Sequence, residues 1–321
     1  MRTKRTTLTR KINFSNPSIE LPCNSILNAV LMNFEITVSN GGASAVTPTI
    51  SDVLKGVSEI KLETDGDRVH YNMNALDAAR MNAFDGNQGT NAVLNQTLSS
   101  IAASGTGTVK FPIIFDKGDI MGAERDNITL KAAFNTGEIA DDLTITAANV
   151  EVTTLERILS NTEAENIYGK NLVRFVEPKV IATTHTNPIN SELAGFYDLP
   201  TGTLLRQSYL NFSATPSRIG LIENSPERVE RLNLSWDAWM DLNKFAYGTN
   251  TIPSNTVVLN YGTEVADNGL GLFGWNYRKS DYQIATKNAS AVDMRVISVE
   301  TVVDQILFEK YGAVIECPMG Y

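Results

Sequence analysis

The side chains best suited to acid–base or metal chemistry are few and far apart in this chain. His70 and His185 are the only histidines, and neither belongs to an HxH or HExxH pattern, the spacings at which histidines commonly ligate zinc. A Ser-His-Asp or Cys-His system would need one of them, and neither neighbourhood resembles a nucleophile elbow. Both are predicted to be ordinary surface or turn residues, and we expect no catalytic site, cofactor or metal.

Two other kinds of ligand-binding pattern lack the context that they need. Residues 269–274 read GLGLFG and match GxGxxG, but the following WNYRKS has no helical period, so a dinucleotide loop is not supported. The acidic pairs in 65–67 (DGD) and 141–142 (DD) could supply oxygen ligands to calcium. Neither has a full calcium-loop pattern, and both are predicted to be solvated turns.

Positive charge gathers at the N-terminus. Five cations precede the first acid, Glu20, although the whole chain has a formal net charge of −9. This segregation favours a negatively charged partner, either anionic lipid headgroups or nucleic-acid phosphates bound without sequence readout. A solvated terminus without a partner stays open. The acidic remainder argues against a dedicated nucleic-acid-binding protein. The five candidate contact residues are Arg2, Lys4, Arg5, Arg10 and Lys11.

Composition and targeting signals narrow the class of protein. A chain of 321 residues with 42% hydrophobic residues and no charge blocks can bury two cores of ordinary size. The two cysteines, Cys23 and Cys317, lie near opposite ends and are predicted to be free thiols. No apolar stretch resembles a signal peptide or a membrane span, so we expect synthesis in the cytoplasm without an export signal.

Alternating apolar and polar residues dominate the chain. Every second residue from Val30 to Val38 is apolar, and the pattern returns in residues 109–115, 128–134, 210–214, 257–261 and 292–296. This period of two, with one apolar face, predicts antiparallel sheets packed face to face. Pro112 predicts an edge strand or a bulge. Irregular spacing and long connections favour jelly-roll or Greek-key wiring over a meander.

Helices are predicted in only three places, at residues 74–84, 237–247 and 155–167, the last bridging the two halves of the chain. Trp236 and Trp239 fall at core-facing positions of the repeated unit, so packing explains them better than sugar binding. Residues 85–108, rich in small and polar side chains, are predicted to form an elaborated surface loop.

The second half of the chain repeats the first. Residues 19–34 (IELPCNSILNAVLMNF) and 197–212 (YDLPTGTLLRQSYLNF) are identical at five of their sixteen positions without gaps. In the same order, 57–63 (VSEIKLE) matches 229–235 (VERLNLS), and 81–84 (MNAF) matches 242–245 (LNKF). A period near half the chain length predicts two copies of one domain rather than a solenoid.

Two similar β domains, each with a short helix and preceded by a basic segment, resemble the double jelly-roll major capsid proteins of tailless icosahedral viruses. This lineage includes adenovirus hexon, and at this length the chain is most similar to compact members from membrane-containing phages. The resemblance covers nearly the whole chain but rests on architecture, because no short motif is diagnostic. The expected parts are a basic arm (1–17), a first jelly roll (18–154), a helical linker (155–175) and a second jelly roll with a C-terminal tail (176–321).

The resemblance implies a structural protein of the virion, made in the host cytoplasm and without catalysis. It implies a homotrimer whose six barrels give a pseudo-hexagonal capsomer that tiles an icosahedral shell. Neighbouring capsomers and minor capsid or vertex proteins are the expected partners. The basic segment would face inward, toward anionic lipid of an inner membrane or toward the genome, and no sequence-specific nucleic-acid contact is expected.

Two other classes of protein remain open at this stage. A carbohydrate-active enzyme built on twin jelly rolls, like the glycan-releasing amidases, would use acidic residues between its barrels and needs no histidine. It predicts a signal peptide or disulfides, and the sequence shows neither. A viral spike or receptor-binding protein would carry one elaborated β domain on a fibrous stalk, and no stalk is visible.

Overall fold

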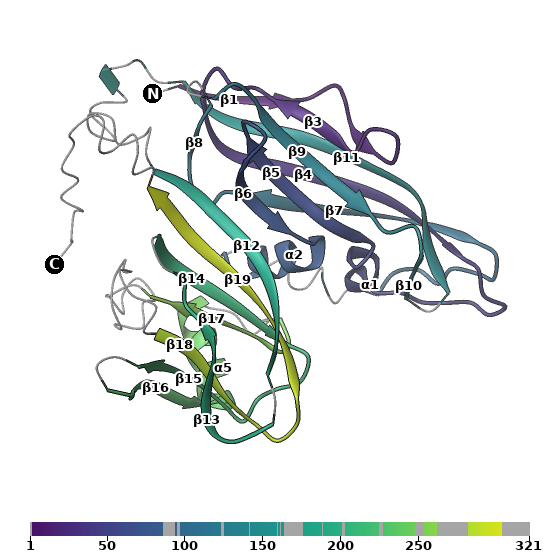
Figure 1. Cartoon of the computed structure of the whole chain (residues 1–321). Coiled ribbons are helices and arrows are strands. Elements are labelled where there is room, and N and C mark those ends of the chain that lie inside the picture. The colour runs from purple at the N-terminus through teal and green to yellow at the C-terminus, as the bar shows by residue number, and fades with distance from the viewer. Residues whose placement is uncertain are drawn as a thin grey trace.

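The computed structural model describes residues 2–85, 94, 97–122, 125–140, 142–158, 160, 162–163, 176–187, 189–200, 203–224, 227–247, 253–261 and 282–303. Within them the chain is built mainly of β-strands and forms two barrels (Figure 1). The first barrel contains β1 (Arg2–Thr7), β2 (Ile12–Asn13), β3 (Ser18–Leu21), β4 (Ile26–Asn40), α1 (Ile50–Leu54), β5 (Val57–Thr64), β6 (Arg68–Met73), α2 (Ala75–Phe84), β7 (Thr106–Phe115), β8 (Ile120–Met121), β9 (Ile128–Phe134), β10 (Glu138–Ala140) and β11 (Leu143–Ile158). The second contains β12 (Val176–Asn187), β13 (Asn190–Asp198), β14 (Leu204–Phe212), β15 (Arg218–Glu223), β16 (Val229–Ser235), α5 (Trp236–Tyr247), β17 (Thr256–Asn260), β18 (Tyr282–Asn288) and β19 (Val292–Val303).

The two barrels have the same strand order. In the first barrel one sheet runs β1-β11-β4-β7 and the facing sheet runs β3-β9-β5-β6. In the second barrel the corresponding orders are β12-β19-β14-β17 and β13-β18-β15-β16. Each of the eight strands in these orders therefore has a counterpart at the same place in the other barrel, which confirms the predicted duplication; the short β2, β8 and β10 are additions to the first barrel.

The barrels share one sheet. Strands β6 and β12 pair in parallel, with Tyr71 opposite Val180 and Asn72 opposite Ile181. This pair joins a sheet of each barrel into a single eight-stranded sheet, β17-β14-β19-β12-β6-β5-β9-β3. Figure 1 shows α2 at this junction, between the two barrels.

The alternating residues fill the cores as predicted. Every second residue of β4 from Val30 to Val38 is buried, and the inward residues of β7, β9, β14, β17 and β19 are buried as well. The inner face of each strand supplies apolar side chains to the core of its own barrel. At the junction, the outer faces of β14, β17 and β19 also bury Tyr209, Val258, Ile297 and Val299 against the first barrel. Pro112 lies on β7, at an end of its described sheet, as an edge-strand proline should.

The two helices predicted to repeat are present. Asn74 caps α2 by accepting a hydrogen bond from the backbone N–H of Asp77, and Ser235 caps α5 by accepting one from Ala238. Trp239 is fully buried and donates from Nε1 to the carbonyl of Ile219, so it packs in the core as expected. The short helix α1 was not predicted.

Three expectations differ from the structure. Strand β11 continues to Ile158, so the helix predicted for residues 155–167 is wrong over 155–158; there the backbone pairs with both β1 and β4. The resemblance of 57–63 to 229–235 aligns β5 with β16, whereas the counterpart of β16 is β6. Within the predicted surface loop 85–108, Leu94 and Ile101 are buried and residues 106–108 belong to β7.

Candidate functional site: the barrel junction and its counterpart surface

An ion pair crosses the barrel junction. Asp77 on α2 is almost fully buried, and its Oδ2 lies 2.6 Å from Nε and 2.5 Å from Nη2 of Arg295 on β19. One helical turn later, Arg80 donates to Oδ1 of Asn211 on β14 at 2.9 Å. The outer face of α2 is thus held on the outer face of β14 and β19. Such a pair is costly to break, because it would leave a buried charge without its partner.

The end of α2 adds an aromatic contact to the junction. Phe84 is 2% exposed and packs edge-to-face on Tyr209 of β14 and on Tyr247 of α5. Tyr209 donates to Oδ1 of Asp85 at 2.8 Å, and Lys117 reaches the same oxygen at 2.5 Å. Burial first, and then the charge of Asp85, raises the pKa of Tyr209 well above its usual value. This hydroxyl is therefore a fixed proton donor that anchors the junction.

A buried histidine lies on β6, the strand of the first barrel that pairs with the second barrel. His70 of β6 donates from Nδ1 to the carbonyl of Pro178 at 3.1 Å, and its Nε2 accepts from the Thr64 hydroxyl at 2.9 Å. Burial lowers the pKa of His70 to about 4, and the nearby charges of Arg125 and Arg68 act in the same direction. The prediction that His70 is a surface or turn residue is wrong, because its two nitrogens satisfy polar groups inside the junction.

An asparagine on each repeated helix accepts a hydrogen bond from a backbone N–H of the adjacent strand. Asn82 of α2 accepts from the N–H of Ile114 at 2.9 Å and donates to its carbonyl at 2.8 Å. Asn243 of α5 accepts from the N–H of Val258 at 3.0 Å. Ile114 pairs with Leu31, and Val258 pairs with Tyr209. Leu31 and Tyr209 are aligned in the repeat, so the two clamps occupy equivalent places in the two barrels.

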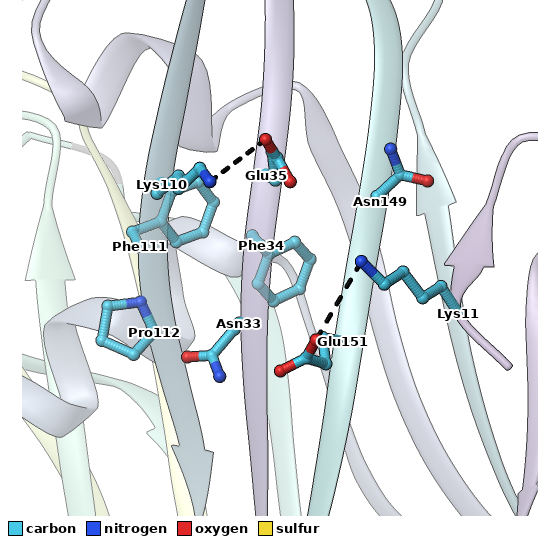
Figure 2. Close-up of a pocket in the computed structure, with 9 residues that line it drawn as sticks. All are labelled: Lys11, Asn33, Phe34, Glu35, Lys110, Phe111, Pro112, Asn149 and Glu151. Carbon is cyan, nitrogen blue, oxygen red and sulfur yellow. Dashed lines mark ion pairs between the residues drawn. The ribbon is translucent and has the colours of Figure 1, made fainter. Parts of the chain in front are cut away.

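The first barrel has its own version of the surface on which α2 docks. Asn33 pairs with Glu151 in the register in which Asn211 pairs with Arg295. This outer face of β4, β7 and β11 holds a shallow hollow of about 300 Å³ (Figure 2). Ion pairs flank it, from Lys110 to Glu35 at 3.2 Å and from Lys11 to Glu151 at 4.0 Å. The hollow is lined by Lys11, Asn33, Phe34, Glu35, Lys110, Phe111, Pro112, Asn149 and Glu151.

The five basic residues predicted to contact a partner do not form a separate arm. Strand β1 pairs antiparallel with β11 along its whole length and carries the exposed Arg2, Lys4 and Arg5. Lys4 lies 3.9 Å from Glu156, and Arg10 donates to Asn16 at 2.7 Å. Burial alone would raise the pKa of Glu156, but hydrogen bonds from Ser25, Thr154 and Thr6 and the charge of Lys4 together lower it. Three of the five basic side chains, Arg2, Lys4 and Arg5, therefore line a sheet edge.

The other sequence candidates lie apart from one another. His185 is on β12 rather than in a turn, against Tyr197. Asp65 begins the tight β5–β6 turn with φ of 55°, and its carboxylate accepts from the Asp126 N–H. Asp142 lies in the turn before β11, and Cys23 is a free thiol. Residues 269–274, Trp275, Asp141 and Cys317 lie outside the described residues.

Two negative findings concern the described residues alone. They contain no group of three or more His, Cys, Asp or Glu side chains placed to hold a metal ion. None of their helices is both long enough and apolar enough to cross a bilayer.

Sequence reasoning missed the junction itself. Asp77 and Arg295 are 218 positions apart, and nothing in either local pattern indicates the other. A signal was present in the repeat: the fourth residue of MNAF is a phenylalanine in both copies, and a phenylalanine on a polar helix face indicates a contact. Comparing the exposed faces of the two helices position by position could have identified the docking face.

Comparisons with known proteins show the fold of this chain. No protein-family model and no curated protein sequence matches the chain. The crystal structure of the STIV MCP superposes with a TM-score of 0.81 at 16% identity, covering 98% of this chain and 100% of that one. The atomic structure of Sulfolobus Turreted Icosahedral Virus gives 0.79, at 16% identity, over 97% of this chain and 94% of the matched chain. The major capsid protein P2 from bacteriophage PM2 gives 0.60 at 9% identity, over 94% and 98%. The chain therefore has the double jelly-roll fold expected from the sequence.

Proposed function

We propose that this chain is the major capsid protein of an icosahedral virus and that three copies form a capsomer with a pseudo-hexagonal outline. The observation that carries the proposal is the duplicated barrel, joined side by side through one continuous sheet. Solved viral capsid proteins match this arrangement over nearly their whole length and nearly the whole length of this chain. Two equivalent barrels let one gene product present six similar lateral faces with only three-fold symmetry.

The activity in this proposal is assembly, without catalysis. Subunits close first into trimers and then into a shell, which resides in the virion after synthesis in the host cytoplasm. Individual contacts between capsomers should be weak and correctable, while the many contacts of a closed shell make it persistent. Minor capsid or vertex proteins are further partners in this proposal.

We also propose an inner partner for the basic residues Arg2, Lys4, Arg5, Arg10 and Lys11. An anionic lipid surface attracts each basic residue near it by about 1 kcal/mol, and β1 presents three of these side chains to solvent. The genome would be bound through the same charges and without sequence specificity.

The decisive test is the native mass of the purified protein by light scattering on a sizing column, followed by electron microscopy. We expect a species of three times the 35.1 kDa chain mass and closed particles at high concentration. A protein that stays monomeric at every concentration and forms no particles would contradict the proposal. A screen for glycosidase and amidase activity then tests the twin-jelly-roll enzyme.

The lipid proposal is tested separately with vesicles. The protein should sediment with phosphatidylserine-containing vesicles and not with pure phosphatidylcholine. Replacing Arg2, Lys4 and Arg5 with Gln should abolish that binding, and Lys55→Gln, at an exposed lysine on α1's C-terminal end, should not. Equal binding by both variants would contradict the assignment.

A further inference from the structure

We propose that copies of this chain dock head to tail by repeating the internal barrel junction, with α5 of one copy on the outer face of β4 and β11 of the next. This inference rests on the proposed self-assembly and names its contact surfaces. The junction has two halves, a helix face and the sheet face on which it docks. One chain contains two copies of each face but uses only one copy of each in its internal junction.

The helix half of the junction is repeated on α5. The N-cap and the clamping asparagine align α2 with α5. In this alignment the outward residues Asp77, Arg80 and Phe84 of α2 correspond to Ala238, Asp241 and Phe245 of α5. Phe84 is 2% exposed and Phe245 is 79% exposed. Among the described residues, α5 thus leaves uncovered the face that α2 buries.

The sheet half of the junction is repeated on the first barrel. Phe84 packs on Tyr209 and Arg80 donates to Asn211, both on the outer face of β14. Their counterparts on β4 are Leu31, which is half-buried, and Asn33, which is exposed. Asn33 lines the shallow hollow of Figure 2, so a receptive surface lies where the equivalent helix would dock.

The two free surfaces have complementary chemistry. Phe245 would cover Leu31, so a contact between phenylalanine and leucine would take the place of the aromatic contact between Phe84 and Tyr209. Asp241 would approach Asn33, where two lysines, Lys11 and Lys110, lie at the rim of the hollow. Asp241 now pairs with Lys244 at 3.3 Å, and the lysines pair with glutamates, so docking exchanges exposed ion pairs for others.

The sheet edges support the same arrangement. Within the chain, β6 pairs in parallel with β12, Tyr71 opposite Val180. The counterparts of these strands are β16 and β1, and both lie at the ends of their described sheets. The register places Leu232 of one copy opposite Arg5 of the next. Pairing of β16 with β1 would satisfy edge groups of both strands, as in β-strand addition.

The differences between the two junctions explain why one is permanent. The buried pair of Asp77 with Arg295 becomes Ala238 facing Glu151 in the proposed contact between copies. Because the contact between copies contains no buried ion pair of this kind, its separation would not leave such a charge buried without its partner. The contact can therefore form and dissociate during assembly. A contact of this heterologous kind closes into a ring when its rotation allows, here a ring of three chains.

The first test is the mass of variants by light scattering over a concentration series. Phe245→Glu should weaken trimer association at least about tenfold, since a central aromatic anchor is lost, while its circular dichroism stays that of the wild type. The matched control is Ile189→Ser, which removes another exposed apolar side chain, outside α5 and β16, and should leave the trimer intact.

The second test is a cross-link in a Cys23→Ser, Cys317→Ser background. Phe245→Cys combined with Leu31→Cys should give disulfide-linked dimers and trimers under oxidation. Phe245→Cys combined with Thr37→Cys should not, because Thr37 lies six residues, or about 20 Å, further along β4. A wild-type trimer that survives Phe245→Glu and gives no cross-link would overturn this inference and leave the proposed function standing. A wild-type chain that is monomeric and forms no particles would overturn both.

Discussion

Helices α2 and α5 occupy the same place in the two barrels, yet one is an interior element and the other lies on the surface. Both are capped by a short polar side chain, and both clamp the neighbouring strand with a buried asparagine. Their outer faces differ in environment, because α2 packs on the second barrel. The comparison teaches that the barrel fold sets the helix, while the neighbouring barrel sets the composition of its outer face.

The outer faces carry the marks of these environments. On α2, Asp77 finds Arg295 and Phe84 finds two tyrosines. On α5 the equivalent positions are Ala238 and Phe245, and the charged Asp241 and Lys244 are exposed. The retained phenylalanine is the exception to this divergence. Phe245 is 79% exposed, whereas its counterpart Phe84 is a buried contact residue.

The largest expected difference between the barrels comes from the paired phenylalanines. Phe84→Ala should destabilise the chain by about 3–5 kcal/mol, because it leaves a cavity between the barrels. Phe245→Ala should change the free energy of unfolding of the separated chain by no more than about 0.5 kcal/mol. Urea unfolding at low protein concentration measures both. Equal effects of the two substitutions would contradict the distinction between a buried and a free helix face.

The junction ion pair should give the next largest effect. Arg295→Met leaves Asp77 buried without its main partner and should cost about 3 kcal/mol, near the lower end for a buried pair because Arg295 is partly exposed. Asp241→Ala on α5 should have almost no effect. Trp236 and Trp239 lie on α5 of the second barrel, and Trp275 also belongs to the second half of the sequence, so tryptophan fluorescence follows the second half of the chain. If the junction couples the barrels, Arg295→Met should separate the fluorescence transition from that of circular dichroism; a single unchanged transition would argue against coupling.

The asparagine clamps should show the opposite behaviour, equality between the barrels. Asn82→Ala and Asn243→Ala each leave a buried backbone N–H without its acceptor, at a cost of about 1–3 kcal/mol. Asn243→Ala should shift the unfolding transition that tryptophan fluorescence follows. Asn82→Ala should shift the unfolding of the first barrel, which circular dichroism records and tryptophan fluorescence does not. A cost confined to one of the two substitutions would show that the clamps are not equivalent.

Much of the fold could be predicted from the sequence because strands with one buried face have a period of two. That pattern located β4, β7, β9 and β19, and helical spacing located α2 and α5. Strand β1 was missed as a strand, because RTKRTT has no apolar residue and is held by backbone pairing to β11. No local pattern marks such pairing.

The junction could not be predicted for a related reason. The β6–β12 pair is parallel and involves two residues of each strand, so it depends on how two complete barrels meet. The match of 57–63 to 229–235 misled because β5 and β16 share an alternation that any strand of this fold could have. The resemblances of 19–34 to 197–212 and of 81–84 to 242–245 hold in the structure: the first aligns β4 with β14, and the second aligns the clamping residues Asn82 and Asn243.

The smallest expected effect is a difference between the barrels in how their stability depends on pH. The position equivalent to His70 in β16 is Arg231, so only the first barrel has a histidine here, and burial lowers the pKa of His70 to about 4. The unfolded chain takes up this proton near pH 6.5 and the folded chain does not. The stabilisation that His70 adds to the free energy of unfolding is therefore fully present above pH 6.5. It declines as the pH falls toward 4, by about 1 kcal/mol between pH 6.5 and 5.5. Urea midpoints of the wild type and of His70→Gln, compared over that interval, should converge as the pH falls. Parallel curves would mean that the histidine titrates normally and that the junction at β6 and β12 is open to water.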